Sequence, residues 1–184
     1  LVGRRSLEVI RSVLREAHDL VIKPAEDPDW LDRLFGSDDM HLLRQCPCPV
    51  WLIKPEERPN YACILAAVGF DPNDHDSDDE TLNRQIVEMA ASLALSDFAE
   101  LHLVHAWDAP GAEFASLWAD NPEAVQRQFA EGGYVAHKAA VDRLAAGLRA
   151  RIGEEAYTYL SPRVHLPRGL AEKEIPALAK NLKA

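Results

Sequence analysis

Residues 36–55 read GSDDMHLLRQCPCPVWLIKP, and this stretch decides the fold class. The run DDMHLLRQC predicts a short helix, which Pro47 and Pro49 end because proline cannot continue a helix. The next run, VWLIK at residues 50–54, is short and apolar at every position before the lysine, as in a strand that is buried on both faces. A helix that leads directly into such a strand favours an α/β protein.

Helix and strand alternate along the rest of the chain as well. The patterns predict helices at residues 5–17, 38–46, from about 78 onward, 122–152 and 171–184, and strands at 19–23, 50–54, 62–68, 100–107 and 161–166. The helix that begins near residue 78 has its expected apolar stripe at Leu82, Ile86, Met89 and Leu93. Strands that alternate with helices pair in parallel through right-handed crossovers, so the sequence predicts a three-layer α/β/α architecture.

Composition excludes several classes of function. The chain has 184 residues and a formal net charge of −10, with no basic run, so nucleic acid and anionic membrane surfaces are poor partners. No apolar run reaches the ~18 residues of a membrane span, and no signal peptide opens the chain. The three cysteines do not fit a disulfide-stapled secreted fold. We therefore expect a cytoplasmic protein, and because the first residue is Leu, a fragment or a processed product.

Four segments together resemble the universal stress protein family, and in particular its tandem members, which carry two such domains in one chain. These segments are HDLVIK, GSDDMHLLRQCPCPVWLIKP, ILAAVGFDP and LHLVHAW. In that family the strand that ends in Pro-Val-hydrophobic-Lys is the last of five, whereas here it comes near the beginning. The resemblance therefore implies that residues 1–56 are the C-terminal half of a first repeat, and that residues 61–184 are the N-terminal part of a second.

The resemblance also implies a five-stranded parallel sheet of the adenine-nucleotide alpha hydrolase-like type. Its central strands would be residues 62–68 and 19–23. Each of the five strand types occurs once, so the two half-repeats could close one domain within a chain or between two chains.

Family members that bind ATP do so beyond the carboxyl ends of these central strands, where ligands bind in open parallel sheets. An Asp closes the first strand, a small apolar residue packs on the base, and a glycine-rich stretch that ends in Gly-Ser holds the phosphates. Here Gly69 stands in the place of the Asp, with Asp71 as a possible substitute, and Ala106 in the place of the base-packing residue. The ligand-binding candidates are Lys23, Gly36, Ser37, Val68, Gly69, Phe70, Asp71, His105 and Ala106.

The phosphate side of this crevice departs from the family pattern. Pro24, Ala25, Glu26 and Asp27 occupy the Gly-x-x-Gly stretch, so that only Gly36 and Ser37 match. Asp38 and Asp39 follow, and their carboxylates repel a polyphosphate at the helix N-terminus. Ser37 or Asp38 could instead simply cap the helix. We expect no required cofactor, and ATP or AMP binding that is weak at best.

The remaining chemistry-bearing residues have ordinary structural interpretations beside functional ones. Cys46 and Cys48 supply two of the four ligands of a zinc site, and buried thiols are favoured over a redox sensor. The acidic run at residues 71–80 lacks the glycine and distal Glu of an EF-hand and is read as a solvated loop. His102 and His105 have no Asp or Ser partner at recognisable spacing, so core histidines are favoured over a general base. No nucleophile motif is present, and the sequence makes no positive case for an enzyme or a metal site.

The resemblance also bears on assembly, because family members pair through their last strand. Val50, Trp51, Leu52 and Ile53 are all apolar, so neither face of this strand is built for water. The chain holds one copy of the strand, so we expect a homodimer through residues 50–54. Three functions stay open: a stress-response binding or signalling protein with a degraded nucleotide-binding crevice, an ATP- or AMP-binding member with slow hydrolysis, or a structural dimerisation module.

Overall fold

A computed structural model describes residues 3–25, 38–54, 61–71, 79–109 and 111–184. The chain folds as two compact units, unit 1 with residues 1–59 and unit 2 with residues 60–184. Unit 1 contains α1 (Gly3–Glu16), β1 (Val21–Pro24), α2 (Asp38–Gln45) and β2 (Val50–Ile53). Unit 2 contains β3 (Cys63–Ala67), α3 (Asp79–Asp97), β4 (Glu100–Val104), α4 (Ala112–Ser116), α5 (Pro122–Ile152), α6 (Glu154–Leu160), β5 (Arg163–His165) and α7 (Ala171–Leu182).

Unit 1 is a parallel pair of strands with two helices. β1 and β2 pair in register from Val21 opposite Val50 to Pro24 opposite Ile53. The connection between the strands contains α2, whose Leu42 is almost completely buried. α2 ends at Gln45, which confirms the prediction that Pro47 and Pro49 stop the helix before the strand.

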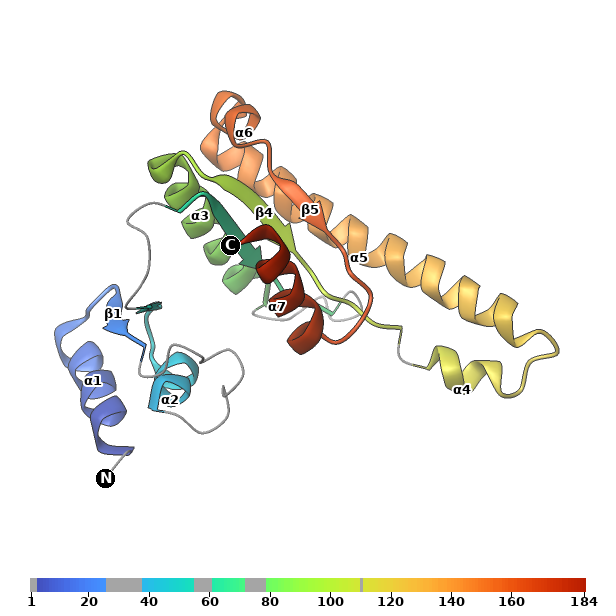
Figure 1. The fold of residues 1–184 in the computed structure, drawn as a ribbon, viewed down its shortest axis with the longest axis horizontal. Helices are drawn as coiled ribbons and strands as arrows, with labels where there is room; N and C mark the ends of the chain where they lie inside the picture. Colours follow the sequence, from blue (N-terminus) through green and yellow to red (C-terminus); the bar gives the residue numbers. More distant parts are fainter. Residues whose placement is uncertain (1–2, 26–37, 55–60, 72–78, 110) are drawn as a thin grey trace. The chain divides into compact units, whose positions relative to one another are not determined.

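Unit 2 has three layers. Its parallel strands are ordered β3-β4-β5, and β4 is buried in the middle. Figure 1 shows α7 in front of this sheet and α5 behind it, and α3 shares the core with α5 and with β3 and β4. The parallel pairing and the layering confirm the predicted α/β/α class.

The strands do not pair as one five-stranded sheet, and this expectation is wrong for the chain as described. They form a two-stranded and a three-stranded sheet, each made only of strands that the connections of one unit bring side by side. A single sheet would need a strand of unit 1 to pair with a strand of unit 2. The strand expected at the centre, β3, therefore lies at an edge of the three-stranded sheet, and β4 is its central strand.

The buried face of α3 also differs from the predicted stripe. Leu82 and Met89 are exposed, and the helix buries Asn83, Val87, Ala90, Ala91 and Ala94. Most of these side chains are alanines, which let the helix backbone lie close to Leu101 and Leu103 of the sheet. A pattern based on large apolar residues misses such a face because alanine carries little hydrophobic signal.

Local signals set the bounds of α5, which match the predicted residues 122–152. The side-chain oxygen of Asn121 accepts the N–H of Ala124 at 3.1 Å, and Pro122 occupies the first turn, where its missing N–H costs nothing. Gly153, at φ +86°, ends the helix in a conformation that side chains disfavour. The sequence patterns do not predict the short helices α4 and α6. Among the described helices, none combines the length and hydrophobicity of a bilayer span.

The close approach of α3 to the sheet predicts the effect of enlarging one of its alanines. In Ala94→Leu, the added side chain has no space in the core, and we expect the free energy of unfolding to fall by about 1–3 kcal/mol. The control is Leu82→Ala on the exposed face, expected to change it by about 0.5 kcal/mol or less. Urea unfolding measures both. If Leu82→Ala lowered the free energy of unfolding more than Ala94→Leu does, the buried face of α3 would be the predicted stripe and not the alanine face.

Candidate functional site

The carboxyl end of β3 is fastened to α3 by one buried side chain. Asn83 lies on the sheet-facing side of α3 and is 3% exposed. Its Oδ1 accepts the N–H of Gly69 at 3.1 Å, and its Nδ2 donates to the carbonyl oxygen of Gly69 at 2.7 Å. Both backbone polar groups of Gly69, the residue in the place of the family Asp, are therefore bonded within the protein. We call this pair of bonds the Asn83 clamp.

His105 is bonded at both ring nitrogens. Its Nδ1 lies 3.1 Å from the carbonyl oxygen of Val68, which can only accept, so Nδ1 carries the proton and donates. Its Nε2 lies 2.8 Å from Nδ1 of His137 on α5 and accepts from it when both rings are neutral. Phe70 stacks on His105 with ring centroids 4.1 Å apart. His105 is a satisfied core histidine, as the sequence favours, and it has a partner that the sequence does not reveal.

Burial keeps both rings of this pair neutral. It lowers the pKa of His105, and the charge that His137 can carry lowers it further, against the opposite effect of the bond to Val68. Burial also lowers the pKa of His137, which the negative charge of Asp71 partly offsets. A proton added at Nε2 of His105 would place two donors face to face, because Nδ1 of His137 already donates there.

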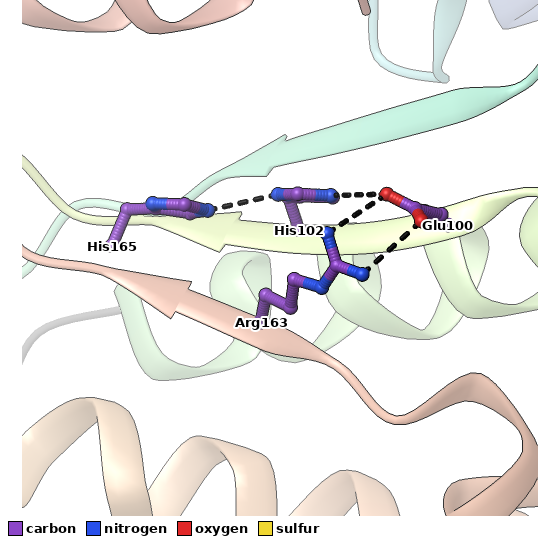
Figure 2. A network of polar contacts seen from close by, with 4 residues as sticks. All are labelled: Glu100, His102, Arg163 and His165. Atoms are coloured by element: carbon purple, nitrogen blue, oxygen red, sulfur yellow. Dashed lines mark hydrogen bonds and ion pairs between the residues drawn. The ribbon is translucent and has the colours of Figure 1, made fainter. Parts of the chain in front are cut away.

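A second histidine pair joins β4 to β5 (Figure 2). Nδ1 of the buried His102 lies 2.8 Å from Nε2 of His165, and its Nε2 lies 3.3 Å from the Glu100 carboxylate. Arg163 donates two bonds to the same carboxylate, at 3.0 and 3.1 Å. These four side chains hold the three-residue strand β5 against β4. Burial lowers the pKa of His165, and the neighbouring His102 and Arg163 lower it further.

A cavity of about 600 Å³ lies between α3 and α5, beside Phe70 and Asp71. Its apolar wall is formed by Val87, Leu144 and Leu148. Arg151 also lines it and pairs with Glu88, with 2.9 Å between Nε and Oε1. Arg84 and Arg143 lie at the same cavity, and neither has an ion-pair partner among the described residues. The size is that of a small-molecule pocket.

In unit 1, the candidate Lys23 is paired with an acidic side chain. The ammonium of Lys23 in β1 contacts Oδ1 of Asp39 as a hydrogen-bonded ion pair. Asp39 lies in the first turn of α2 and is buried. A helix N-terminus attracts negative charge, and here a carboxylate of the protein supplies it. Gly36 and Ser37 lie outside the described residues, as does most of the acidic run, residues 72–78.

The structure therefore brings only part of the predicted set together. Val68, Gly69, Phe70 and His105 surround the end of β3, and half-buried Ala106 follows β4. Lys23 belongs to unit 1. Sequence reasoning misses Asn83 and His137. A signal for Asn83 exists, because it is the one polar residue on the buried stripe of α3, whereas His137 lies on a long, largely exposed helix without any such signal.

The predicted dimer strand lies in unit 1 with Cys46 and Cys48, and Cys63 lies in unit 2. Val50, Trp51, Leu52 and Ile53 are all half-buried, and β2 is an edge strand of its two-stranded sheet. Cys63 is buried in β3, as expected for a core thiol. Cys46 and Cys48 are half-buried instead, so their assignment as buried thiols is wrong. They lie in the bend between α2 and β2.

Sequence similarity to known proteins establishes the family of this chain. Universal stress protein E of Escherichia coli strain K12 is 31% identical over 180 residues, 96% of this chain. The Universal stress protein E homolog of Haemophilus influenzae is 31% identical over 173 residues, 91% of this chain. The chain belongs to the universal stress protein family. It spans about half the length of the curated relatives it matches, 52% and 50% of these two. No protein-family model matches the chain.

A solved structure agrees with the family in fold. The crystal structure of a functionally unknown protein from Pseudomonas aeruginosa PAO1 matches 97% of this chain and 54% of its own, with a TM-score of 0.62 and 24% identity. At this identity the likeness shows the fold alone. This member of the universal stress protein family thus shares its α/β/α architecture with the neighbour.

The lowered histidine pKa values predict how stability depends on pH in this universal stress protein family member. His105, His137 and His165 bind protons less readily when folded than when unfolded, so the unfolded state takes up more protons as the pH falls below about 6.5. The free energy of unfolding, measured in urea, should therefore fall between pH 7 and pH 5.

Replacing one of these histidines separates their effect from that of other groups. His137→Gln removes one titrating ring, and its stability should fall less steeply with acid than that of the wild type. His41→Gln, on the exposed side of α2, is the control and should keep the wild-type slope. A wild-type stability that is constant or rises from pH 7 to pH 5 would contradict this assignment.

Proposed function

We propose that this chain is part of a stress-response binding or signalling protein whose nucleotide-binding crevice has degraded. Its membership of the universal stress protein family supports the stress-response role. The observation that best supports a degraded nucleotide-binding crevice is the ion pair between Lys23 and Asp39. Lys23, one of the ligand-binding candidates, is neutralised by a carboxylate in the first turn of α2, where a phosphate would otherwise be attracted.

The base side of the expected crevice supports the same proposal. An adenine nucleotide is recognised by polar groups that can bond to it, and at Gly69 both backbone groups already bond to Asn83. Both ring nitrogens of His105 are engaged as well. A nucleotide would have to break these bonds before it could form its own, and an unmatched buried polar group costs about 1–3 kcal/mol.

Two further features favour binding over a purely structural role. The cavity between α3 and α5 has the volume of a ligand pocket, and two arginines without an ion-pair partner among the described residues line it. The protein would then respond to a small molecule in the cytoplasm without hydrolysing it. The tandem arrangement, with residues 1–56 and 61–184 as parts of two successive repeats, is the organisation that we propose for the whole protein.

The ion pair predicts that removing one negative charge improves nucleotide binding. We expect the wild type to bind ATP and AMP more weakly than micromolar in isothermal titration. Asp39→Asn keeps the shape of the side chain and removes its negative charge from the first turn of α2, and it should tighten ATP binding roughly two- to fivefold, the effect of one charge at a helix N-terminus.

A matched variant controls for net charge. Asp142→Asn also removes a carboxylate paired with a lysine, Lys138 at 2.5 Å, but on the exposed surface of α5. It should leave the affinity for ATP unchanged. Micromolar or tighter binding by the wild type would overturn the degraded crevice, and equal gains in both variants would show only a change in net charge.

We also propose that the chain forms a homodimer through β2. β2 is an edge strand, and all four of its residues are apolar: Val50, Trp51, Leu52 and Ile53. An apolar edge strand can pair with a strand of a second chain. A stable interface of this kind buries on the order of 1,200–2,000 Å² in total. Leu52→Glu should shift the sedimenting species from dimer to monomer in analytical ultracentrifugation. Leu43→Glu, on an exposed side chain of α2, should leave a dimer. Wild-type protein that sediments as a monomer at high concentration would refute the interface.

A further inference from the structure

Cys46 and Cys48 place two thiols in contact at the surface of unit 1. Cys46 directly follows α2, where its N–H donates to the carbonyl oxygen of Leu42 at 2.9 Å, and Cys48 lies two residues before β2. Their Sγ atoms are 3.7 Å apart, and both residues are half-buried. The pair is therefore accessible, in contrast to the buried Cys63.

The backbone holds this pair in place. Pro47 separates the two cysteines and Pro49 follows them, which fixes φ at both positions. The carbonyl oxygen of Pro49 accepts the N–H of Val21 at 3.0 Å, so the bend is tied to β1 at its end and to α2 at its beginning. Two sulfurs held in this way have lost much of their conformational entropy before any ligand binds.

The surroundings favour a soft cation over reaction as a nucleophile. The negative charge of Asp19 acts on this pair through Cys48. A carboxylate such as that of Asp19 repels a thiolate but attracts a cation. Metal binding supplies the positive charge that these sulfurs lack, in exchange for their protons.

The number of ligands selects the ion. The described residues contain no group of three or more His, Cys, Asp or Glu side chains that could hold a metal, so a four-ligand zinc site is not available among them. Two thiolates suit Cu(I), which soft sulfur ligands select. Two metal–sulfur bonds of about 2.3 Å, the zinc–thiolate length, that meet at the roughly 120° of a three-coordinate ion span about 4.0 Å, so the pair at 3.7 Å needs little rearrangement.

We propose that Cys46 and Cys48 form a two-thiolate site for Cu(I). On binding, two S–Cu bonds form, the two S–H bonds break, and both protons go to solvent. Copper stays Cu(I), so no oxidant or reductant takes part. The two sulfurs leave a third coordination position open to a small thiol. The site is independent of the nucleotide proposal, since it uses none of the same residues.

A disulfide is the competing fate of the pair. It would require the sulfurs to approach from 3.7 Å to about 2.05 Å across a ring with only Pro47 between the cysteines, which strains the bond. It would also need a two-electron oxidant. The test is therefore made without oxygen, after a thiol assay has confirmed three free thiols in this chain.

The test is an anaerobic titration of the whole protein with Cu(I), in competition with a chromogenic Cu(I) chelator. We expect one Cu(I) per chain, a sulfur-to-copper charge-transfer absorption in the ultraviolet, and the release of two protons. Cys46→Ser and Cys48→Ser should each lose this competition, whereas Cys63→Ser should retain it. Far-UV circular dichroism checks that all three variants fold.

Several results would overturn the site. Wild-type protein that fails to take Cu(I) from the chelator excludes it. Copper retained by both Cys46→Ser and Cys48→Ser places the ion elsewhere. Copper lost in a folded Cys63→Ser variant would also place the ion elsewhere. A wild type with fewer than three free thiols after anaerobic reduction would show that the disulfide is the stable form of the pair.

Discussion

The hydrogen bonds between Asn83 and Gly69 are the interaction on which the end of the sheet depends. A carboxamide matches a peptide group in both directions, so one buried side chain satisfies the N–H and the C=O where β3 leaves the ladder. Loss of one partner would leave a buried polar group unsatisfied, at a cost of about 1–3 kcal/mol. The clamp fixes the path of Val68 and Phe70, and these two in turn hold His105 by a hydrogen bond and by stacking.

Our proposal that this chain binds nucleotides weakly rests on the same interactions. Ligand sites in parallel sheets use backbone and side-chain groups that the fold leaves without partners beyond the strand ends. In unit 2 the Asn83 clamp and His137 engage such groups, and in unit 1 Asp39 engages Lys23. The fold itself is held by a core between the sheet and the helices.

Much of the fold could be predicted from the sequence, and less of the site. The bounds of α5 are found because its capping residues are local signals, and β2 is found because its run is fully apolar. The buried face of α3 is predicted wrongly, because alanines pack well without giving a strong hydrophobic signal in the sequence. The single five-stranded sheet fails because strand pairing depends on contacts between distant segments. His137 lies far along the chain from His105 and the Asn83 clamp joins two elements, so no local spacing reveals either contact.

Hydrogen exchange at the amide of Gly69, followed by nuclear magnetic resonance, tests the central claim most directly. If Asn83 already satisfies this group, the amide should exchange slowly in the free protein, and saturating ATP should not change its rate. An amide that exchanges at the rate of an unprotected peptide in the free protein, and becomes protected when ATP is added, would contradict the account and show a crevice whose polar groups are available to a nucleotide.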